Sequence, residues 1–253
     1  MLVMQSRAYR ETAPNIGERP VMKFWLCLFF STAVPLVASA QWTAAAYIGK
    51  THTADADIRV ISRPTTDVLF NNVAFDDRSF QSPLYYGLRA GYMLTRSTGI
   101  ETEFIHIKAF ARVNDPVAAR GSLPALGNVN TTVAPASVLP QYGVSHGLNL
   151  VLGNFVWRHE LSHRLALTVR PGLGVAVPHP EIRALGGAAL EEYQLHGAAI
   201  QIAGGGDFEL SRHVFWLAEY KFTTTRPRCE LGSVTVENTF ATHHLVTGLG
   251  FRF

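Results

Sequence analysis

The most constraining feature of this sequence is an alternation of apolar and polar side chains with a period of two residues. It is clearest at the C-terminus, where one face would carry Leu245, Thr247, Leu249, Phe251 and Phe253 and the other His244, Val246, Gly248, Gly250 and Arg252. Successive side chains of a β-strand point to opposite faces, so the pattern predicts a strand with one apolar face. After Gln41 no apolar run reaches the ~20 residues of a spanning helix, which excludes a helical membrane protein.

Eight segments with this alternation are predicted, and most approach the ~9–11 residues of a tilted membrane strand. They cover residues 41–53, 84–94, 99–110, 144–157, 165–170, 193–210, 216–223 and 244–253. Short connections at 95–98, 159–163 and 211–213 alternate with long segments at 54–83, 111–142, 178–192 and 226–238. The prediction is an all-β fold, an eight-stranded antiparallel transmembrane β-barrel with short periplasmic turns and long extracellular loops. The prolines of segment 111–142 predict little regular structure there.

A soluble β-sandwich would also show alternation, so the polar face decides between the two folds. That face is rich in charge, which a dry core could bury only as ion pairs. The barrel prediction instead places these charges in the lumen, as an ion-pair network of Arg89, Glu101, Glu103, Lys221 and Arg252. A small diffusion pore is the least favoured function, because side chains can fill the interior of an eight-stranded barrel.

The N-terminal region has the order of a secretory signal peptide. Lys23 precedes the apolar residues 24–30, and Ala38-Ser39-Ala40 provides a small-residue cleavage site. We therefore expect residues 1–40 to be an overlong leader that is cleaved after Ala40, and residues 41–253 to form the barrel domain. Cleavage would remove four basic and two acidic residues together with Cys27. The mature chain would be near neutral, with no nucleic-acid surface, and Cys229 would have no disulfide partner.

Residues 159–163 (HELSH) match the zinc-protease motif H-E-x-x-H, in which two histidines one helical turn apart bind the metal. The motif has that meaning only on a helix. Here it lies in a predicted periplasmic turn between two strands, so a turn is the favoured interpretation.

The predicted strand directions place most histidines at one end of the barrel. The outer ends of the strands would carry His52, His106, His146, His179, His196, His243 and His244, whereas His159, His163 and His213 would lie at the periplasmic turns. Such a rim could bind a divalent metal or supply acid and base groups to a substrate in the outer leaflet. The candidate catalytic residues are His106, His146, Asn149, Glu219 and His244, and the candidate metal ligands are His146, His179, His243 and His244. The alternative is that these histidines merely tolerate the polar interface.

Five short segments resemble outer-membrane barrels akin to the lipid A oxidase of rhizobia. They are residues 99–108 (GIETEFIHIK), 145–149 (SHGLN), 178–181 (PHPE), 219–222 (EYKF) and 242–244 (THH). The resemblance implies an enzyme that uses oxygen to oxidise the proximal glucosamine of lipid A at the outer face of the membrane. Carried over residue by residue, it points to His106, His146, Asn149, His179, Glu219, His243 and His244.

The expected location is the outer membrane of a Gram-negative bacterium, with lipopolysaccharide and outer-membrane lipid as partners. The terminal Phe253 resembles the signal that such barrels present to their assembly machinery, and we expect a monomer. A non-catalytic, OmpA-like surface barrel that binds ligands through its long loops remains the alternative to an enzyme.

Overall fold

A computed structural model describes residues 42–144 and 146–253. The predicted leader and its cleavage site lie outside the described residues. Within the described part of the chain, no helix is long and apolar enough to cross a membrane.

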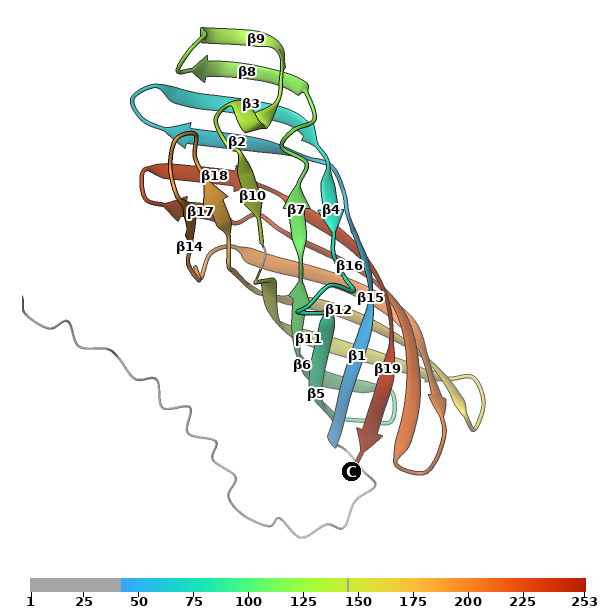
Figure 1. The fold of residues 1–253 in the computed structure, drawn as a ribbon. Coiled ribbons are helices and arrows are strands. Elements are labelled where there is room, and N and C mark those ends of the chain that lie inside the picture. The colour runs from blue at the N-terminus through green and yellow to red at the C-terminus, as the bar shows by residue number, and fades with distance from the viewer. Residues whose placement is uncertain (1–41, 145) are drawn as a thin grey trace, which may run out of the picture. The chain divides into compact units, whose positions relative to one another are not determined.

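The centre of the structure is a closed antiparallel barrel of eight strands, as the alternation predicted (Figure 1). The strands are β1 (Trp42–Thr53), β5 (Tyr86–Met93), β6 (Thr98–Ile107), β11 (Leu148–Glu160), β12 (Leu165–Pro178), β15 (Ala198–Glu209), β16 (Val214–Thr225) and β19 (Phe240–Arg252). Each pairs with its neighbours along the chain, and β1 closes the barrel against β19, from Thr43 opposite Arg252 to Thr53 opposite Thr242. The predicted fold class is confirmed.

Strand β12 is longer than predicted, because Pro171 and Gly172 do not end it. Its ladder with β11 is interrupted between the pairs Asn154–Gly172 and Trp157–Val169, so Pro171 has no paired residue on that side. Proline lacks the N–H that a central strand would have to donate. The interruption lets the strand continue to Pro178, where it carries the chain to the extracellular end of the barrel.

The long extracellular segments fold into two further sheets, which corrects the expectation of little regular structure in 111–142. The five-stranded sheet contains β14 (Ala189–Glu191), β13 (Glu181–Arg183), β10 (Gln141–Gly143), β7 (Ala109–Ala111) and β4 (Phe75–Asp77). The six-stranded sheet contains β17 (Arg228–Leu231), β18 (Val234–Asn238), β2 (Ala56–Ser62), β3 (Thr66–Val73), β8 (Val117–Leu123) and β9 (Gly127–Val133), and a 3-10 turn covers Pro135–Ser137. Buried Ile58, Phe70 and Val236 belong to an apolar core in these sheets. Four pairings in these sheets are local hairpins, β2–β3, β8–β9, β13–β14 and β17–β18. The pairings that join them, such as β18 with β2 and β10 with β13, connect different loops, so local patterns did not reveal the sheets.

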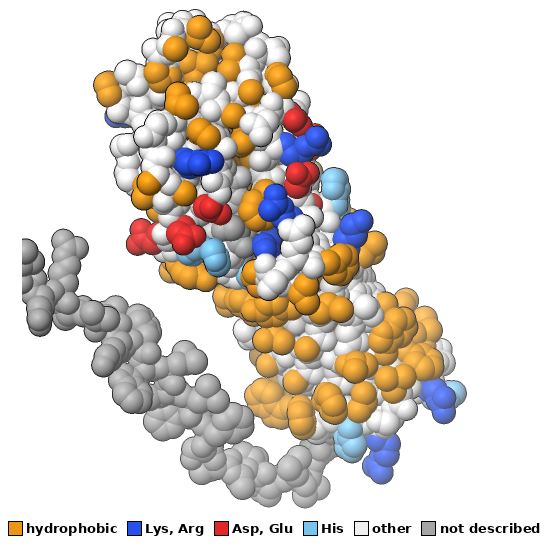
Figure 2. All heavy atoms as spheres, viewed as in Figure 1, with side chains coloured by type: hydrophobic (Ala, Val, Ile, Leu, Met, Phe, Trp, Pro, Cys, Tyr) orange, Lys and Arg blue, Asp and Glu red, His pale blue; other side chains and the backbone are white. Residues whose placement is uncertain are grey.

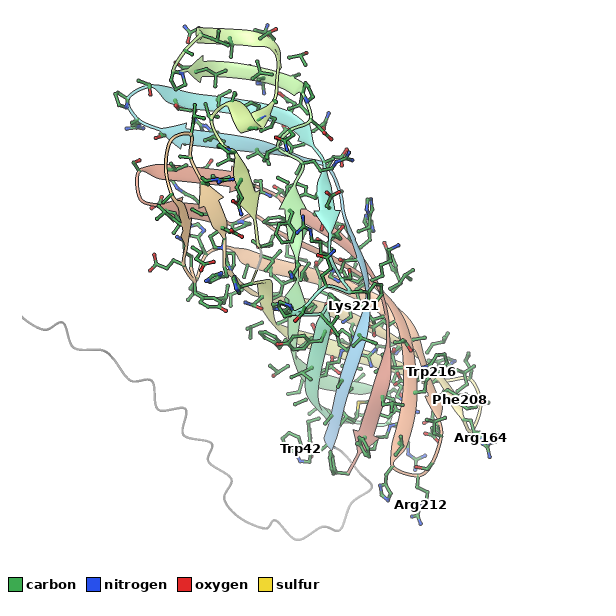
Figure 3. The ribbon with its side chains drawn as sticks, in the orientation of Figure 1. Trp42, Arg164, Phe208, Arg212, Trp216 and Lys221 are labelled. Atoms are coloured by element: carbon green, nitrogen blue, oxygen red, sulfur yellow. The ribbon has the colours of Figure 1, made fainter. Side chains whose placement is uncertain are left out.

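The outer wall of the barrel is apolar. Leu173 and Leu245 are 70% and 67% exposed, and Figure 2 shows hydrophobic side chains gathered around the barrel wall. The aromatic residues Trp42, Phe208 and Trp216 lie toward the short-turn end, and Figure 3 places Arg164 and Arg212 at the turns beyond them. A closed barrel with an apolar outside and an aromatic border is the architecture by which β-strands cross a bilayer.

Candidate functional site

A pocket lies on the outer wall of the barrel, where β6, β11 and β12 reach their extracellular ends. Its volume is about 390 Å³. It is lined by Pro83, Tyr86, Phe104, His106, His146, Asn149, Val151, Val177 and Tyr193. Phe104, Val151 and Val177 give the pocket an apolar wall on the barrel strands, and the histidines and Asn149 give it a polar one. The pocket therefore lies where the apolar barrel surface meets the extracellular segments.

His106 and Asn149 point out of the barrel, since their strand neighbours Ile105 and Leu150 point inward and are fully buried. The two residues are direct cross-strand partners in the β6–β11 ladder. Although they face outward, only 5% of His106 and 8% of Asn149 is exposed. His106 and Asn149, both predicted site residues, are in contact because they are paired across the two strands and point to the same side of the sheet.

The hydrogen bonds of Asn149 determine the tautomer of His106. Asn149 Nδ2 donates to the carbonyl oxygen of Val177 (3.3 Å), so its Oδ1 is turned toward His106 Nδ1 at 2.8 Å. Nδ1 must then carry the proton and donate it, which leaves the lone pair of the neutral ring on Nε2. His106 Nε2 is buried and has no hydrogen-bond partner within the described residues. An oriented neutral imidazole with an unshared lone pair is in the protonation state of a general base.

Two neighbours hold the imidazole of His106 in place. The ring of Tyr86 stacks on it, with centroids 5.3 Å apart and an interplanar angle of 22°. Gly147 covers it from the extracellular side with a φ of 112°, and a Cβ at this position would lie 2.3 Å from His106 Cε1. Glycine is required here both by the backbone conformation and by the close approach. The carbonyl oxygen of Gly147 also accepts a hydrogen bond from the backbone N–H of His179 (2.9 Å).

A second polar group adjoins the pocket, formed by His146, His179 and Glu191. One nitrogen or oxygen ligand atom from each of the three side chains lies within 4.8 Å of the others. His146 Nδ1 is 3.5 Å from Glu191 Oε2, and the rings of His146 and His179 meet edge to face at 4.8 Å. His179 also packs on Tyr193, with ring centroids 4.2 Å apart. Two imidazoles and one carboxylate form a donor set that can bind a divalent metal.

The structure brings together His106, His146, Asn149 and His179, but not the other candidates. β19 is separated from β11 by three strands in either direction around the barrel. His243 points outward on that far side, where it bonds Tyr220 Oη (2.6 Å), and its ring stacks on His52. A single metal site containing His146, His179, His243 and His244 is therefore not formed.

His244 and Glu219 lie inside the barrel. His244 Nδ1 is 3.0 Å from Tyr85 Oη, and its Nε2 is 2.9 Å from Thr223 Oγ1. Glu219 accepts hydrogen bonds from Arg89 and from Arg170 (2.5 Å), and it lies 3.1 Å from Lys221 Nζ. Both residues make their hydrogen bonds inside the lumen, and neither lines the outer pocket.

The lumen is filled at mid-height by an ion-pair network. Arg89 Nε donates to Glu103 Oε1 (2.8 Å), and Lys221 also donates to that carboxylate. Tyr47, Asn154 and Gln201 complete the hydrogen bonds to Glu103. The side chains of Glu103 and Lys221 are 0% exposed. Glu101 joins the same network at 3.4 Å from Arg89. Arg252 pairs with Glu209 and is linked to the network through Asp207, which lies 3.9 Å from both Arg252 and Arg170.

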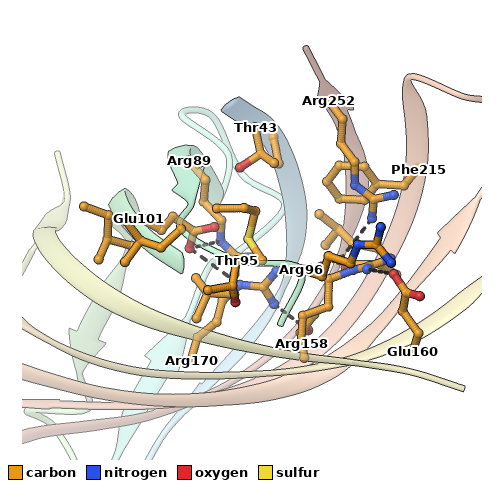
Figure 4. Close-up of a pocket in the computed structure, with 18 of the residues that line it drawn as sticks. Thr43, Arg89, Thr95, Arg96, Glu101, Arg158, Glu160, Arg170, Phe215 and Arg252 are labelled. Carbon is orange, nitrogen blue, oxygen red and sulfur yellow. Dashed lines mark hydrogen bonds and ion pairs between the residues drawn. The ribbon is translucent and has the colours of Figure 1, made fainter. Parts of the chain in front are cut away.

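Below this network the lumen opens into a cavity of about 510 Å³ toward the short-turn end (Figure 4). Its charged lining consists of five arginines and four carboxylates: Arg89, Arg96, Arg158, Arg170 and Arg252 with Glu101, Glu160, Asp207 and Glu209. The cavity is therefore lined by charges of both signs.

The HELSH segment forms the end of β11 and a bend, with His159 and Glu160 in the strand. Its residues therefore do not take the helical arrangement of the zinc-protease motif. Glu160 pairs with Arg158 at 2.5 Å, and His159 stacks on Trp157. The turn interpretation agrees with this geometry.

Sequence reasoning missed Glu191, Tyr193 and Gly147. Glu191 and Tyr193 belong to a long loop whose path depends on pairing between β13 and β14. Tyr193 was placed in a predicted strand that in fact begins at Ala198. For Gly147, the available signal was its position between two candidate residues in the segment 145–149.

No protein-family model matches the chain, and no curated protein matches it. Among solved structures, Ail of Yersinia pestis, in complex with the heparin analogue sucrose octasulfate, is 12% identical with a TM-score of 0.36, over 84% of this chain and 99% of Ail. Neisserial surface protein A is 11% identical with a TM-score of 0.42, over 84% and 96% of the two chains. The protease OmpT of Escherichia coli is 9% identical with a TM-score of 0.44, over 87% and 99%.

These likenesses concern the fold. The closed barrel, its apolar outer wall and its polar lumen define the class: the protein is a β-barrel of the bacterial outer membrane. The short turns and long extracellular segments have the asymmetry of that class.

Proposed function

We propose that the protein is an enzyme that modifies lipid A in the outer leaflet, and that the pocket around His106 and Asn149 is its active site. The observation that carries the proposal is the unpartnered Nε2 of a buried, oriented histidine, among the described residues, in a pocket on the outer wall of the barrel. A substrate embedded in the outer leaflet could reach this pocket without leaving the membrane.

The pocket has the mixed lining that a glycolipid would require. Phe104 and Val151 offer apolar contact to acyl chains, and the rings of Tyr86 and Tyr193 offer flat surfaces for a sugar. His106 Nε2 would accept the proton of a substrate hydroxyl, while Asn149 holds the ring in the required tautomer. Asn149 would be a positioning residue, because it acts through His106.

The resemblance to the lipid A oxidase family supplies the particular reaction, oxidation of the proximal glucosamine at a free reducing end. His106 would take the hydroxyl proton as the C1–H bond breaks and two electrons pass to dioxygen, which is released as hydrogen peroxide. The lactone so formed would add water and open to an aminogluconate unit. The net change in the lipid is the gain of one oxygen atom.

The test is mass spectrometry of lipid A from host cells that express this protein in their outer membrane together with a lipid A 1-phosphatase, which supplies the free reducing end, and no other lipid A modifying enzyme. We expect a gain of one oxygen with the wild type, its loss with His106→Ala, and a reduced yield with Asn149→Ala. His163→Ala, in a periplasmic turn, is the matched control and should retain the product. Unmodified lipid A from a wild-type barrel that is folded and heat-modifiable on a gel would refute the proposal.

A second function, ligand binding without catalysis, is favoured by the extracellular sheets. Their apolar core, which includes Ile58, Phe70 and Val236, makes an ordered platform rather than a set of loose loops. A diffusion pore has no such support, because Glu103 and Lys221 fill the middle of the lumen. Unmodified lipid A in the experiment above would leave ligand binding as the better description.

A further inference from the structure

We infer that His146, His179 and Glu191 form a binding site for a divalent first-row transition metal at the extracellular edge of the outer pocket. The inference deepens the proposed function, because the metal would lie beside His106. Its binding test, however, requires no lipid chemistry.

The three side chains come from separate segments that the fold brings together. His146 precedes β11, His179 follows β12, and Glu191 ends β14. The hydrogen bond from the backbone N–H of His179 to the carbonyl oxygen of Gly147 fixes two of these segments to each other. Pairing of β13 with β14, which sets Glu181 opposite Glu191, brings the third segment alongside.

The spacing of the donor atoms suits one ion after small side-chain rotations. Ligand atoms bound to one zinc ion at ~2.0–2.2 Å lie at most about 4 Å apart. The three candidate atoms lie within 4.8 Å of one another, and the pair His146 Nδ1 and Glu191 Oε2 is already at 3.5 Å. The side chains of His146 and Glu191 are 56% and 53% exposed, so both have room to move toward an ion.

An independent observation comes from His179, which is less adaptable than the other two. Only 8% of this residue is exposed, and its Nδ1 is buried without a hydrogen-bond partner in residues 42–144 and 146–253. Buried polar atoms normally have a hydrogen-bond partner, and a place at an ion-binding site is one accepted reason for an exception. The unpartnered nitrogen belongs to the side chain that sits between His146 and Tyr193.

The donor types define the class of metal. Mg²⁺ and Ca²⁺ prefer sets of oxygen ligands, whereas imidazole suits zinc, iron and copper. Two histidines and one carboxylate are the protein ligands of several catalytic zinc sites and of non-haem Fe(II) oxygenases, and both keep coordination positions open. The three residues here would likewise leave positions open for a water or a substrate oxygen.

The direct test is metal binding by the refolded, chelator-treated barrel in detergent. Calorimetry with Zn²⁺, visible absorption with Co²⁺ and anaerobic titration with Fe²⁺ would give the stoichiometry and the preferred metal. We expect one ion per chain. We also expect affinity to fall by at least about tenfold in His146→Ala, His179→Ala and Glu191→Gln. His163→Ala should bind as the wild type does. His52→Ala/His243→Ala removes the stacked histidine pair on the far side of the barrel and should also leave the affinity unchanged.

A second readout uses the position of Arg183, an exposed trypsin site on β13 next to β14. Metal binding would tie this hairpin to the barrel rim, so Zn²⁺ should slow cleavage at Arg183 in the wild type but not in Glu191→Gln. Heat-modifiability on a gel establishes that each variant is folded. Absence of binding, or equal binding by all variants, would overturn the inference.

The outcomes separate this inference from the proposed function. A bound metal with unmodified lipid A would refute the enzyme and leave the metal site standing. Lipid A oxidation that is unaffected by Glu191→Gln, with no metal bound, would refute the metal site and leave the enzyme standing.

Discussion

Two buried histidines of this barrel, His244 in the lumen and His106 on the outer wall, lie in opposite situations. Both ring nitrogens of His244 have hydroxyl partners, Tyr85 and Thr223. His106 has one partner, Asn149, and its Nε2 has none among the described residues. Only 5% of His106 and 1% of His244 is exposed, so exposure alone does not separate the two side chains. They differ in the unpartnered Nε2 of His106, which under the proposed function is the atom that exchanges a proton.

The largest expected loss of stability is for a substitution in the lumen, the region that contains His244. Glu103→Ala would remove one of the two carboxylates that buried Arg89 and Lys221 share, leaving Glu219 as the other. Removing one partner of a buried ion pair costs ~3–5 kcal/mol, so the free energy of unfolding should fall by about that amount. Urea unfolding in lipid vesicles measures it, with the exposed Glu230→Ala as control. A loss no larger than that of the control would mean that the network does not stabilise the barrel.

Gly147→Ala should have the next largest effect and should act on the outer pocket. The added Cβ would collide with the imidazole of His106, and the φ of 112° disfavours any side chain. We expect a destabilisation of ~1–3 kcal/mol together with loss of lipid A modification. Gly186→Ala is a matched control, because Gly186 also has a positive φ but its Cβ would meet open space. Equal loss of modification in both variants would contradict the role assigned to Gly147.

His244→Ala should destabilise the barrel without affecting the chemistry. It leaves the hydroxyls of Tyr85 and Thr223 without their partner inside the lumen, at a cost of ~1–3 kcal/mol. Lipid A modification should persist at temperatures where the variant is folded. Complete loss of modification in a folded His244→Ala barrel would move the active site into the lumen.

His106→Ala should show the reverse pattern. It removes one hydrogen bond, to Asn149, where His244→Ala removes two, so the free energy of unfolding should fall by the smaller amount, about 1–2 kcal/mol, while modification should be abolished. Measuring both the free energy of unfolding and the mass of lipid A for His106→Ala and His244→Ala tests the comparison directly. Equal losses of stability and of modification in the two variants would contradict the distinction between the two histidines.

The smallest effect concerns Cys229 in the extracellular core, a buried group that lies in neither region. Burial raises the pKa of this thiol to about 12, although Tyr142 partly offsets the effect. Since the thiolate is the reactive form, Cys229 should remain protonated and react slowly with iodoacetamide at pH 8. Mass spectrometry should find it labelled rapidly only after unfolding. Rapid labelling of the folded barrel would mean that the extracellular core opens readily.

The barrel was predictable from the sequence because most strands carry two signals, apolar residues on the outer face and charged or small residues on the lumenal face. The same alternation contained more about the site than was drawn from it. His243 and His244 are adjacent in one strand and must face opposite sides, so they could never have shared a site with each other. By the same rule His106 shares the outward face with Ile100 and Phe104, and register pairs it with Asn149.

Other parts of the structure had no local signal. The two extracellular sheets depend on pairing between residues far apart in the sequence, such as Glu237 with Arg59, and loop composition does not encode such pairs. Glu191 reaches the pocket only through the β13–β14 pairing. The cluster of His146, His179 and Glu191 comes from three separate loops, so it can be recognised only from the three-dimensional structure.

The outward orientation of His106 also determines how a ligand would meet the protein. A pocket on the lipid-facing wall is reached by lateral diffusion within a leaflet, so occupancy would follow the mole fraction of a ligand among the lipids rather than its concentration in water. The filled lumen has no part in that route. Under the proposed function, the barrel would therefore carry out chemistry on its outer wall while Glu103 and Lys221 fill the middle of its lumen.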